Sequence, residues 1–373
     1  MKVTIEGSKA VAQAVKLARV KVIPCYPITP QTHIMEGTAE LIANGDFKAE
    51  LIDVESEHSS ISACVGAQAA GVRTFTTSSS QGLALMHEIL FIASGLRLPI
   101  VMAVANRALS APINIWNDHQ DSISERDAGW LQFYVESSQE ALDTVLMAYK
   151  IAENHKVLLP VMVCLDGYTI THTDEQVDIP EQKNVDRLLG NYKPFYKLDT
   201  KKPISIGPIA FPNSFMDFRK AQQEAMNNSI LVIKEVQKEF AKQFKREYSL
   251  IEVYNPNKSK KAVIAMGSVC GTIRHVIDEE NENIALIKIR CFRPFPKEDL
   301  IKACKNFEAI AVIDRSISPG QSAPVFTEVS SIIKDKKIKS FIAGLGGRDV
   351  KIEHIQKISE NMSKTSEKEE WLL

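Results

Sequence analysis

The first 170 residues alternate short apolar segments with segments of helical pattern, and this alternation limits the fold more than any other feature. Apolar runs of strand length occur at 21–25, 49–54, 72–77, 99–105, 131–135 and 157–166. Segments long enough for helices lie between them, for example 8–19, 58–71 and 138–154. Strands that alternate with helices predict a parallel sheet covered by helices on both faces.

The rest of the chain predicts a connection followed by a smaller α/β domain. Residues 178–212 contain five prolines, which favours a connection that wraps the surface. A long helix is predicted over 214–246, where apolar residues recur four apart. A second series of strands and helices follows. We expect a first domain over 1–235, a second over 248–350 and a peripheral charged tail over 351–373.

Composition and charge exclude several classes of function. Lys and Arg total 45 and Asp and Glu total 46, so the formal net charge of −1 offers no field to attract nucleic acid. The N-terminus lacks the apolar core of a signal peptide and no apolar run approaches the length of a membrane span, so we expect a cytoplasmic protein. Six scattered cysteines without a C-x-x-C pair argue against a disulfide framework and against an iron-sulfur cluster held by this chain alone.

Polar residues follow four of the predicted strands. Ligands of open parallel sheets bind beyond the carboxyl ends of the strands. Thr29, Glu57, the turn 78–82 and the pair Asn106-Arg107 each stand directly after a strand. We therefore expect these residues to meet at one edge of the sheet.

These residues also have purely structural interpretations. Thr29, followed by Pro30, predicts the N-cap of a helix over 30–43, worth about 1 kcal/mol. The functional alternative is that this helix start presents a hydroxyl and free N–H groups to an anionic substrate. Glu57 suits the first turn of a helix through the helix dipole, and Arg107 is a surface cation in the simplest interpretation.

Residues 115–121, IWNDHQD, contain Asp118, His119 and Asp121, which are residue types that bind metals. The first two are adjacent in the sequence and no distant partner is evident, so metal binding at this motif is not favoured.

Six motifs, in this order, resemble the α subunits of the pyruvate:ferredoxin oxidoreductase family, within the 2-oxoacid:ferredoxin oxidoreductases. They are YPITPQT (26–32), the run from VESEHSS to ALSAP (54–112), IWNDHQD (115–121), DGYTITH (166–172), DRSISPG (314–320) and GLGGRD (344–349). The resemblance covers nearly the whole chain. It implies a doubly wound α/β domain that binds the pyrimidine end of thiamine diphosphate, followed by a smaller domain similar to the C-terminal domain of transketolase.

The resemblance also implies an activity and a set of site residues. The family decarboxylates a 2-oxoacid with coenzyme A and passes the electrons to ferredoxin or flavodoxin. Glu57 matches the glutamate that bonds the pyrimidine ring nitrogen, which promotes the reactive tautomer of the cofactor. Thr29 and Arg107 match the residues that hold the substrate, where a planar guanidinium suits a carboxylate. Further contacts to the cofactor fall to Pro27, Ile28, Ser80 and Gln81.

Thiamine enzymes bind the diphosphate and its metal through a Gly-Asp-Gly motif followed by Asn-Asn. The nearest candidate here is Asp166-Gly167 after Leu165, and the Asn-Asn pair at 227–228 is too far away. The resemblance therefore implies a complex of four chains, in which β, γ and δ subunits complete the site and hold Mg²⁺ and the [4Fe-4S] clusters.

Three alternatives stay open. The same chemistry on 2-oxobutyrate, a branched-chain 2-oxoacid, 2-oxoglutarate or oxalate needs only a few changed side chains, although NRALSAP with IWNDHQD looks more like the pyruvate type. A non-catalytic scaffold subunit is weakened by the presence of Thr29, Glu57 and Arg107. A self-sufficient thiamine decarboxylase is disfavoured because the diphosphate motif is missing.

Overall fold

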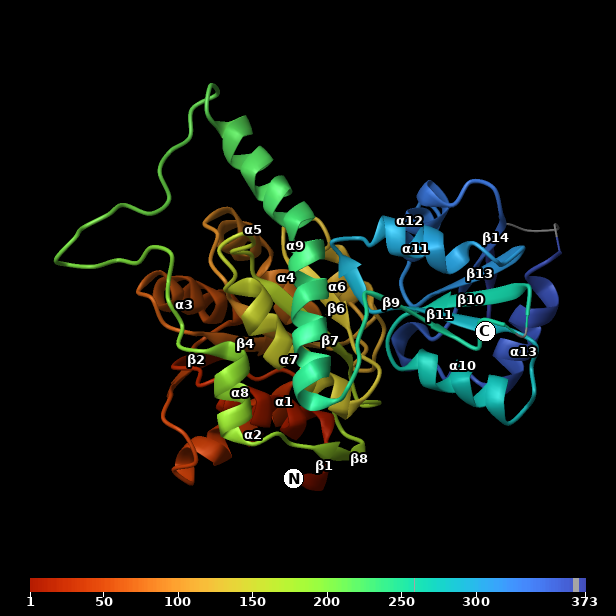
Figure 1. The fold of residues 1–373 in the computed structure, drawn as a ribbon, viewed down its shortest axis with the longest axis horizontal. Helices are drawn as coiled ribbons and strands as arrows, with labels where there is room; N and C mark the ends of the chain where they lie inside the picture. Colours follow the sequence, from red (N-terminus) through yellow and green to blue (C-terminus); the bar gives the residue numbers. More distant parts are fainter. Residues whose placement is uncertain (258, 365–368) are drawn as a thin grey trace.

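A computed structural model describes residues 1–257, 259–364 and 369–373 and shows two α/β domains lying side by side (Figure 1). The first domain contains the N-terminal two thirds of the chain, and the second contains most of the remainder. A long helix, α9 (Phe215–Phe244), comes between them in the chain and packs against α7 (Ser138–Ala152) of the first domain. The predicted α/β class is confirmed.

The main sheet of the first domain has the strand order β12-β6-β7-β5-β4. Its four parallel strands are β4 (Phe75–Ser78), β5 (Val101–Asn106), β6 (Leu131–Tyr134) and β7 (Val161–Asp166). The edge strand β12 (Cys291–Arg293) is antiparallel and comes from the second half of the chain, which the sequence did not predict.

Two short strand pairs extend this domain. The parallel pair β2 (Val22–Cys25) and β3 (Glu50–Asp53) continues beyond β4, because Val22 bridges Thr74 just before β4. The antiparallel pair β1 (Lys2–Glu6) and β8 (Asp174–Asp178) lies at the N-terminus. The carboxyl ends of β2, β3, β4 and β5 therefore lie at the same edge of the first domain.

Helices cover both faces of the main sheet. They are α1 (Gly7–Leu17), α2 (Thr32–Ala43), α3 (Glu57–Ala69), α4 (Ser80–Leu85), α5 (His87–Gly95), α6 (Gln120–Ser124), α7, α8 (Gln182–Leu189) and α9. Alternate residues of β5 enter different cores: Val101 and Ala103 pack among residues of α1 and α7, whereas Met102 and Val104 pack on the opposite face. A strand buried on both faces explains why the 99–105 run is apolar at every position.

The second domain is a six-stranded sheet in the order β15-β14-β13-β10-β11-β9. Its strands are β9 (Ile251–Tyr254), β10 (Lys261–Ala265), β11 (Ala285–Ile289), β13 (Ala309–Asp314), β14 (Lys337–Ile342) and β15 (Glu369–Trp371), with only β9 antiparallel to its neighbour. Its helices are α10 (Val269–Asp278), α11 (Lys297–Cys304), α12 (Pro324–Ile332) and α13 (Ile352–Asn361), with a 3-10 turn, η1, at Leu345–Gly347. Within the stretch 351–373, α13 and β15 belong to this domain, while 365–368 lie outside the described residues.

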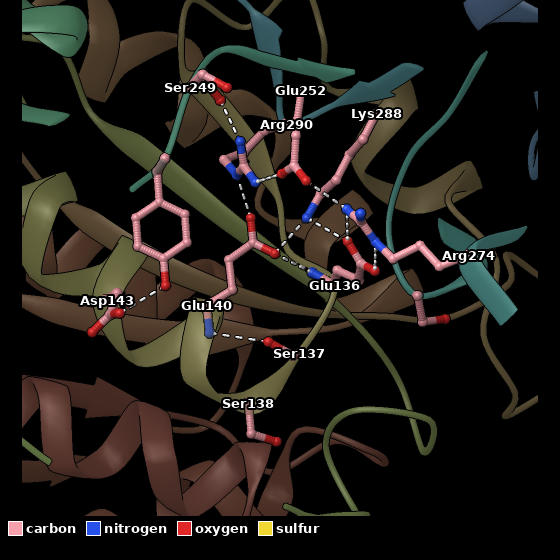
Figure 2. A network of polar contacts seen from close by, with 12 residues as sticks. Glu136, Ser137, Ser138, Glu140, Asp143, Ser249, Glu252, Arg274, Lys288 and Arg290 are labelled. Carbon is pink, nitrogen blue, oxygen red and sulfur yellow. Dashed lines mark hydrogen bonds and ion pairs between the residues drawn. The ribbon is translucent and has the colours of Figure 1, made fainter. Parts of the chain in front are cut away.

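The two domains share one apolar core and one cluster of charges. Ile264 and Ile287 of the second sheet belong to the same buried cluster as Met102 and Tyr134 of the first. Glu136 and Glu140, around the start of α7, meet basic residues of the second domain (Figure 2). Glu140 Oε2 accepts a hydrogen bond from Lys288 Nζ at 2.6 Å and its other oxygen accepts one from Arg290, while Glu136 Oε1 lies 2.9 Å from Arg274 Nε.

The proline-rich connection leaves the body of the domain. Residues 182–189 of this region form α8, which the sequence did not predict. Residues beyond about 198 then form a long loop that stands away from the sheet and leads to the tip of α9 (Figure 1). Several of its large apolar side chains are exposed, among them Ile209 and Phe211, whereas Ile206 packs against the apolar core. Exposure continues at Met216 of α9. Among the described helices, no segment is both long and apolar enough to cross a membrane.

Candidate functional site

The four strand ends singled out from the sequence come together at one edge of the first domain. The guanidinium of Arg107, after β5, donates from Nη1 to the carbonyl of Thr29, after β2, at 3.0 Å. Glu57, at the start of α3, lies against Gly82 of α4, the short helix that follows β4. Because the strands are parallel and neighbours in space, the loops after them are neighbours too. The sequence prediction of a shared edge is confirmed.

Glu57 is a buried carboxylate without a partner. Its residue is 7% exposed, and its side chain makes no hydrogen bond or ion pair with any residue that the structure describes. A Cβ placed on Gly82 would lie 2.4 Å from Glu57 Oε1 and 2.6 Å from Ser78 Oγ, so glycine there leaves room for the carboxylate in its present position. The hydroxyls of Thr77 and Ser78 are also buried and unpaired within the described chain. Burying such groups costs free energy, which a ligand with complementary polar atoms recovers.

Arg107 is a buried guanidinium that faces carbonyl oxygens. It is 8% exposed, and Nε donates to the carbonyl of Asn114 at 2.8 Å while Nη1 donates to Thr29. No carboxylate lies within ion-pair distance of this guanidinium in the described part of the chain. Burial lowers the pKa of Arg107 below its ordinary value, an effect opposed by Tyr168 and Asp121. A desolvated cation held by neutral acceptors keeps its charge available for an anion.

Thr29 is not the N-cap of a helix, so that prediction was wrong. Helix α2 begins at Thr32, with Gln31 at the N-cap position. Residues 28–31 form a separate turn, in which the N–H of Gln31 donates to the carbonyl of Ile28 at 2.8 Å. The side chain of Gln31 satisfies this turn, because Oε1 accepts from the N–H of Ile28 at 3.2 Å and Nε2 donates to the carbonyl of Thr77 at 3.2 Å. Thr29 is therefore exposed at the tip of the turn.

The remaining predicted contact residues line the same edge. Pro27 is exposed and Ile28 is half-buried beside Thr29. Ser80 is buried and Gln81 is half-buried, and Ser80 Oγ donates to Gln81 Oε1 at 2.5 Å. Ser80 has a positive φ of 47°, which is unusual for a residue with a side chain. The turn predicted over 78–82 is shorter in the structure, because Ser78 ends β4 and Ser80 already begins α4.

The IWNDHQD motif joins the two domains. His119 Nε2 lies 2.7 Å from Asp166 Oδ1, and Asp166 Oδ2 accepts from Arg315 of the second domain at 2.7 Å. Asp118 accepts from the N–H of Gly346 at 3.0 Å, which explains why DRSISPG and GLGGRD accompany this motif. Among the described residues, no group of three metal-binding side chains is close enough to hold a metal ion.

Three residues that shape this edge were not predicted as site residues from the sequence: Gln31, Gly82 and Asp121. Gln31 and Gly82 stood inside quoted motifs, but only contacts across the fold explain them, namely those to Thr77 and Glu57. Asp121 was weighed only as a metal ligand. The carboxylate instead accepts the N–H groups of Ser80 and Arg107, both at 2.9 Å. Nothing local in IWNDHQD separates Asp121 from Asp118, so only the contacts across the fold assign this role.

Comparison with known proteins identifies the family. Residues 13–238 match the family described as pyruvate flavodoxin/ferredoxin oxidoreductase, thiamine diphosphate-binding, which is more than half of the chain. Residues 259–355 match the pyruvate:ferredoxin oxidoreductase core domain II. The chain belongs to the pyruvate:ferredoxin oxidoreductase family. Its first domain is the thiamine diphosphate-binding domain of these oxidoreductases, and its second is their core domain II.

Relatives within this oxidoreductase family match over nearly their full length. Pyruvate synthase subunit PorA of Methanocaldococcus jannaschii is 56% identical over 370 residues, which cover 97% of this chain and 95% of the relative. Ketoisovalerate oxidoreductase subunit VorA of Pyrococcus horikoshii is 44% identical, covering 98% and 95%. A solved 2-oxoglutarate:ferredoxin oxidoreductase from Magnetococcus marinus, with 2-oxoglutarate, coenzyme A and succinyl-CoA bound, has the same fold, with a TM-score of 0.74 at 18% identity. The likeness covers 97% of this chain and 65% of that one.

Proposed function

We propose that this chain is the α subunit of a four-subunit pyruvate:ferredoxin oxidoreductase. The complex would convert pyruvate and coenzyme A to acetyl-CoA and carbon dioxide, with the electron pair passing to ferredoxin or flavodoxin, and would also run in reverse. One observation carries this proposal. The carboxylate of Glu57 and the guanidinium of Arg107 are both buried at the same edge of the sheet, and neither has an ion-pair partner among the described residues.

Glu57 fits the role of holding the pyrimidine ring of thiamine diphosphate. Its unpaired carboxylate and the unpaired hydroxyl of Ser78 lie together beside Gly82, where the absence of a side chain leaves room for both. When bound, thiamine diphosphate supplies an electron sink for the pair released as a 2-oxoacid loses its carboxylate. Glu57 would exchange a proton with the ring nitrogen that it faces. Pro27, Ile28, Ser80 and Gln81 would flank the cofactor.

Arg107 and Thr29 fit the role of orienting the oxoacid. The guanidinium is fixed by two backbone carbonyls, so little freedom is lost when it pairs with a substrate carboxylate. The exposed hydroxyl of Thr29 stands on a turn tied down by Gln31 and would donate to a substrate oxygen. Both residues would act by binding and alignment.

Partner chains are part of the proposal. The β subunit would bring the diphosphate and Mg²⁺, and the [4Fe-4S] clusters would be held by partner subunits, because all six cysteines here are free, dispersed and buried. Large exposed apolar side chains on the loop before α9, such as Phe211, are typical of a chain that contacts other subunits. We also propose a cytoplasmic location and a division of the chain into two domains near residues 235–248.

The nearest alternative is the same reaction on a branched-chain 2-oxoacid. A ketoisovalerate relative is 44% identical, and a few side chains can change the preference for a substrate. The 56% identity to a pyruvate synthase subunit favours pyruvate.

The experiment is to purify the native complex anaerobically and follow viologen reduction with coenzyme A and a panel of 2-oxoacids. We expect the highest kcat/KM with pyruvate, in a complex that contains three further chains. A preference for a branched-chain 2-oxoacid would change the assigned substrate and leave the proposed mechanism in place. A chain that purifies alone and is inactive would contradict the proposal.

Glu57→Gln tests the role of the carboxylate within that complex. It should lower turnover by about 100-fold or more while the four chains still assemble, because an amide does not exchange the proton. Turnover near the wild-type value would remove Glu57 from the mechanism.

A further inference from the structure

Asp121 lies between two of the strand-end turns that form the candidate site. It is 2% exposed, at the start of α6, and both of its carboxylate oxygens are used. Oδ2 accepts the N–H of Ser80 at 2.9 Å and the N–H of Arg107 at 2.9 Å. Oδ1 accepts from Asn106 Nδ2 at 2.8 Å and from the N–H of Ser122 at 2.7 Å. One side chain therefore joins the turn after β4 to the turn after β5.

The bonding pattern requires a carboxylate. All four partners are donors, so a side chain with acceptors on both ends is needed, and an asparagine would turn its own NH₂ toward one pair of them. Within the described residues, Asp121 has no cationic side chain in ion-pair contact, and burial raises its pKa to about 6. Burying an ionised carboxylate without a counter-ion costs free energy. The position of the backbone at Ser80 and Arg107, which this carboxylate holds, therefore matters.

The bonds fix both ends of the Arg107 residue. Its backbone N–H is held by Asp121, and its guanidinium is held by the carbonyls of Thr29 and Asn114. The same carboxylate oxygen fixes Ser80, whose positive φ of 47° is otherwise unfavourable. Movement of Asp121 would therefore shift the substrate side and the cofactor side of the edge together.

We propose that Asp121 is a positioning residue that sets the turn carrying Arg107 against the turn carrying Ser80, and that specificity for the oxoacid carboxylate depends on it. The proposal rests on the proposed function, because it takes Arg107 as the group that binds the carboxylate. Asp121 itself does not touch the substrate.

The test compares Asp121→Asn with wild type in the complete purified complex, by viologen reduction with separate titrations of pyruvate and coenzyme A. We expect the KM for pyruvate to rise about tenfold or more, the KM for coenzyme A to stay within twofold, and kcat to fall less than the pyruvate KM rises. An unchanged pyruvate KM, or equal increases for both substrates, would overturn the inference.

A reciprocal exchange provides the rescue. In Asn106→Asp combined with Asp121→Asn, the new amide at 121 faces a carboxylate at 106, and its oxygen still accepts from Ser80 and Arg107; only the bond from the N–H of Ser122 is not restored. The double variant should recover a pyruvate KM within about threefold of wild type. If Asp121→Asn alone does not assemble, the double variant decides: recovery supports the inference, and a raised KM or failed assembly overturns it.

Asp314→Asn is the matched control. Asp314 is also fully buried and accepts two backbone N–H groups, from Val325 and Phe326 at 2.8 and 2.9 Å, but it lies in the second domain. Asp314→Asn should leave the KM values for pyruvate and coenzyme A unchanged. If it raises the pyruvate KM as much as Asp121→Asn does, the effect comes from general destabilisation and the inference is overturned. Arg107→Ala distinguishes a failure of the proposed function from a failure of this inference. If Arg107→Ala leaves the pyruvate KM unchanged, the assigned role of Arg107 is wrong. If Arg107→Ala raises the pyruvate KM but Asp121→Asn does not, only the present inference is contradicted.

Discussion

Gly82 is the residue on which the position of Glu57 depends. A side chain there would start 2.4 Å from Glu57 Oε1 and 2.6 Å from Ser78 Oγ, closer than non-bonded atoms approach. Gly82 lies within α4 and its φ is not positive, so its own backbone does not require glycine. The neighbouring carboxylate does.

Gly82→Ala should displace the carboxylate of Glu57 and lower turnover of the complex at least about tenfold, because catalytic groups tolerate little misplacement. Viologen reduction by the assembled complex measures this. The control is Gly66→Ala, in the interior of the neighbouring helix α3, where a Cβ meets nothing within 4 Å. That variant should keep full turnover and gain up to about 1 kcal/mol of stability from helix propensity. Equal losses in both variants would contradict the assignment.

At the scale of elements, the turn before α2 is fixed by one amide. Gln31 links the turn 28–31 to the end of β4, and this link keeps Thr29 next to Arg107. A helix cap, which the sequence predicted, would have been satisfied by local groups alone. The structure instead uses a side chain that reaches another strand.

Gln31→Glu tests this link with almost no change in volume. The carboxylate can still accept from the N–H of Ile28 but cannot donate to the carbonyl of Thr77, so the free energy of unfolding should fall by about 2 kcal/mol. Urea unfolding of the full chain measures the change. Gln223→Glu, on the exposed face of α9, should change it by less than about 0.5 kcal/mol. A loss no larger than in this control would show that the amide does not hold the turn.

At the scale of the whole molecule, the charge cluster in Figure 2 joins the domains. Burial alone would raise the pKa of Glu140, but attraction by Arg290 and Lys288 outweighs it and lowers the pKa from 4.5 to about 2. A carboxyl whose pKa is lower in the folded state contributes stability above about pH 4.5. That contribution is lost as the pH falls toward 2.

Glu140→Gln should therefore lower the free energy of unfolding by about 3 kcal/mol at pH 7, since it leaves Lys288 and Arg290 with fewer counter-charges. The difference from wild type should shrink as unfolding is measured at pH 4 and then pH 3. Glu239→Gln removes an exposed carboxylate that lies 3.3 Å from Nζ of the half-buried Lys150, and should cost less than about 1 kcal/mol. A difference for Glu140→Gln that stays constant with pH would contradict the linkage.

The sequence by itself determined the alternation of strands and helices, the α/β class and the edge at which Thr29, Glu57 and Arg107 meet. These follow from local hydrophobic period and from one rule about parallel sheets, and neither depends on distant contacts. The resemblance in the motifs added the family and the chemistry to expect.

Only the tertiary structure decided how those residues are held. Gln31 bonds to Thr77 across 46 positions, Asp121 bonds to Ser80 across 41, and Glu140 bonds to Lys288 across 148. β12 likewise leaves the second half of the chain to complete the first sheet. Such pairings depend on which surfaces come together when the core closes, and side chains far apart in a sequence carry no local pattern that reveals them.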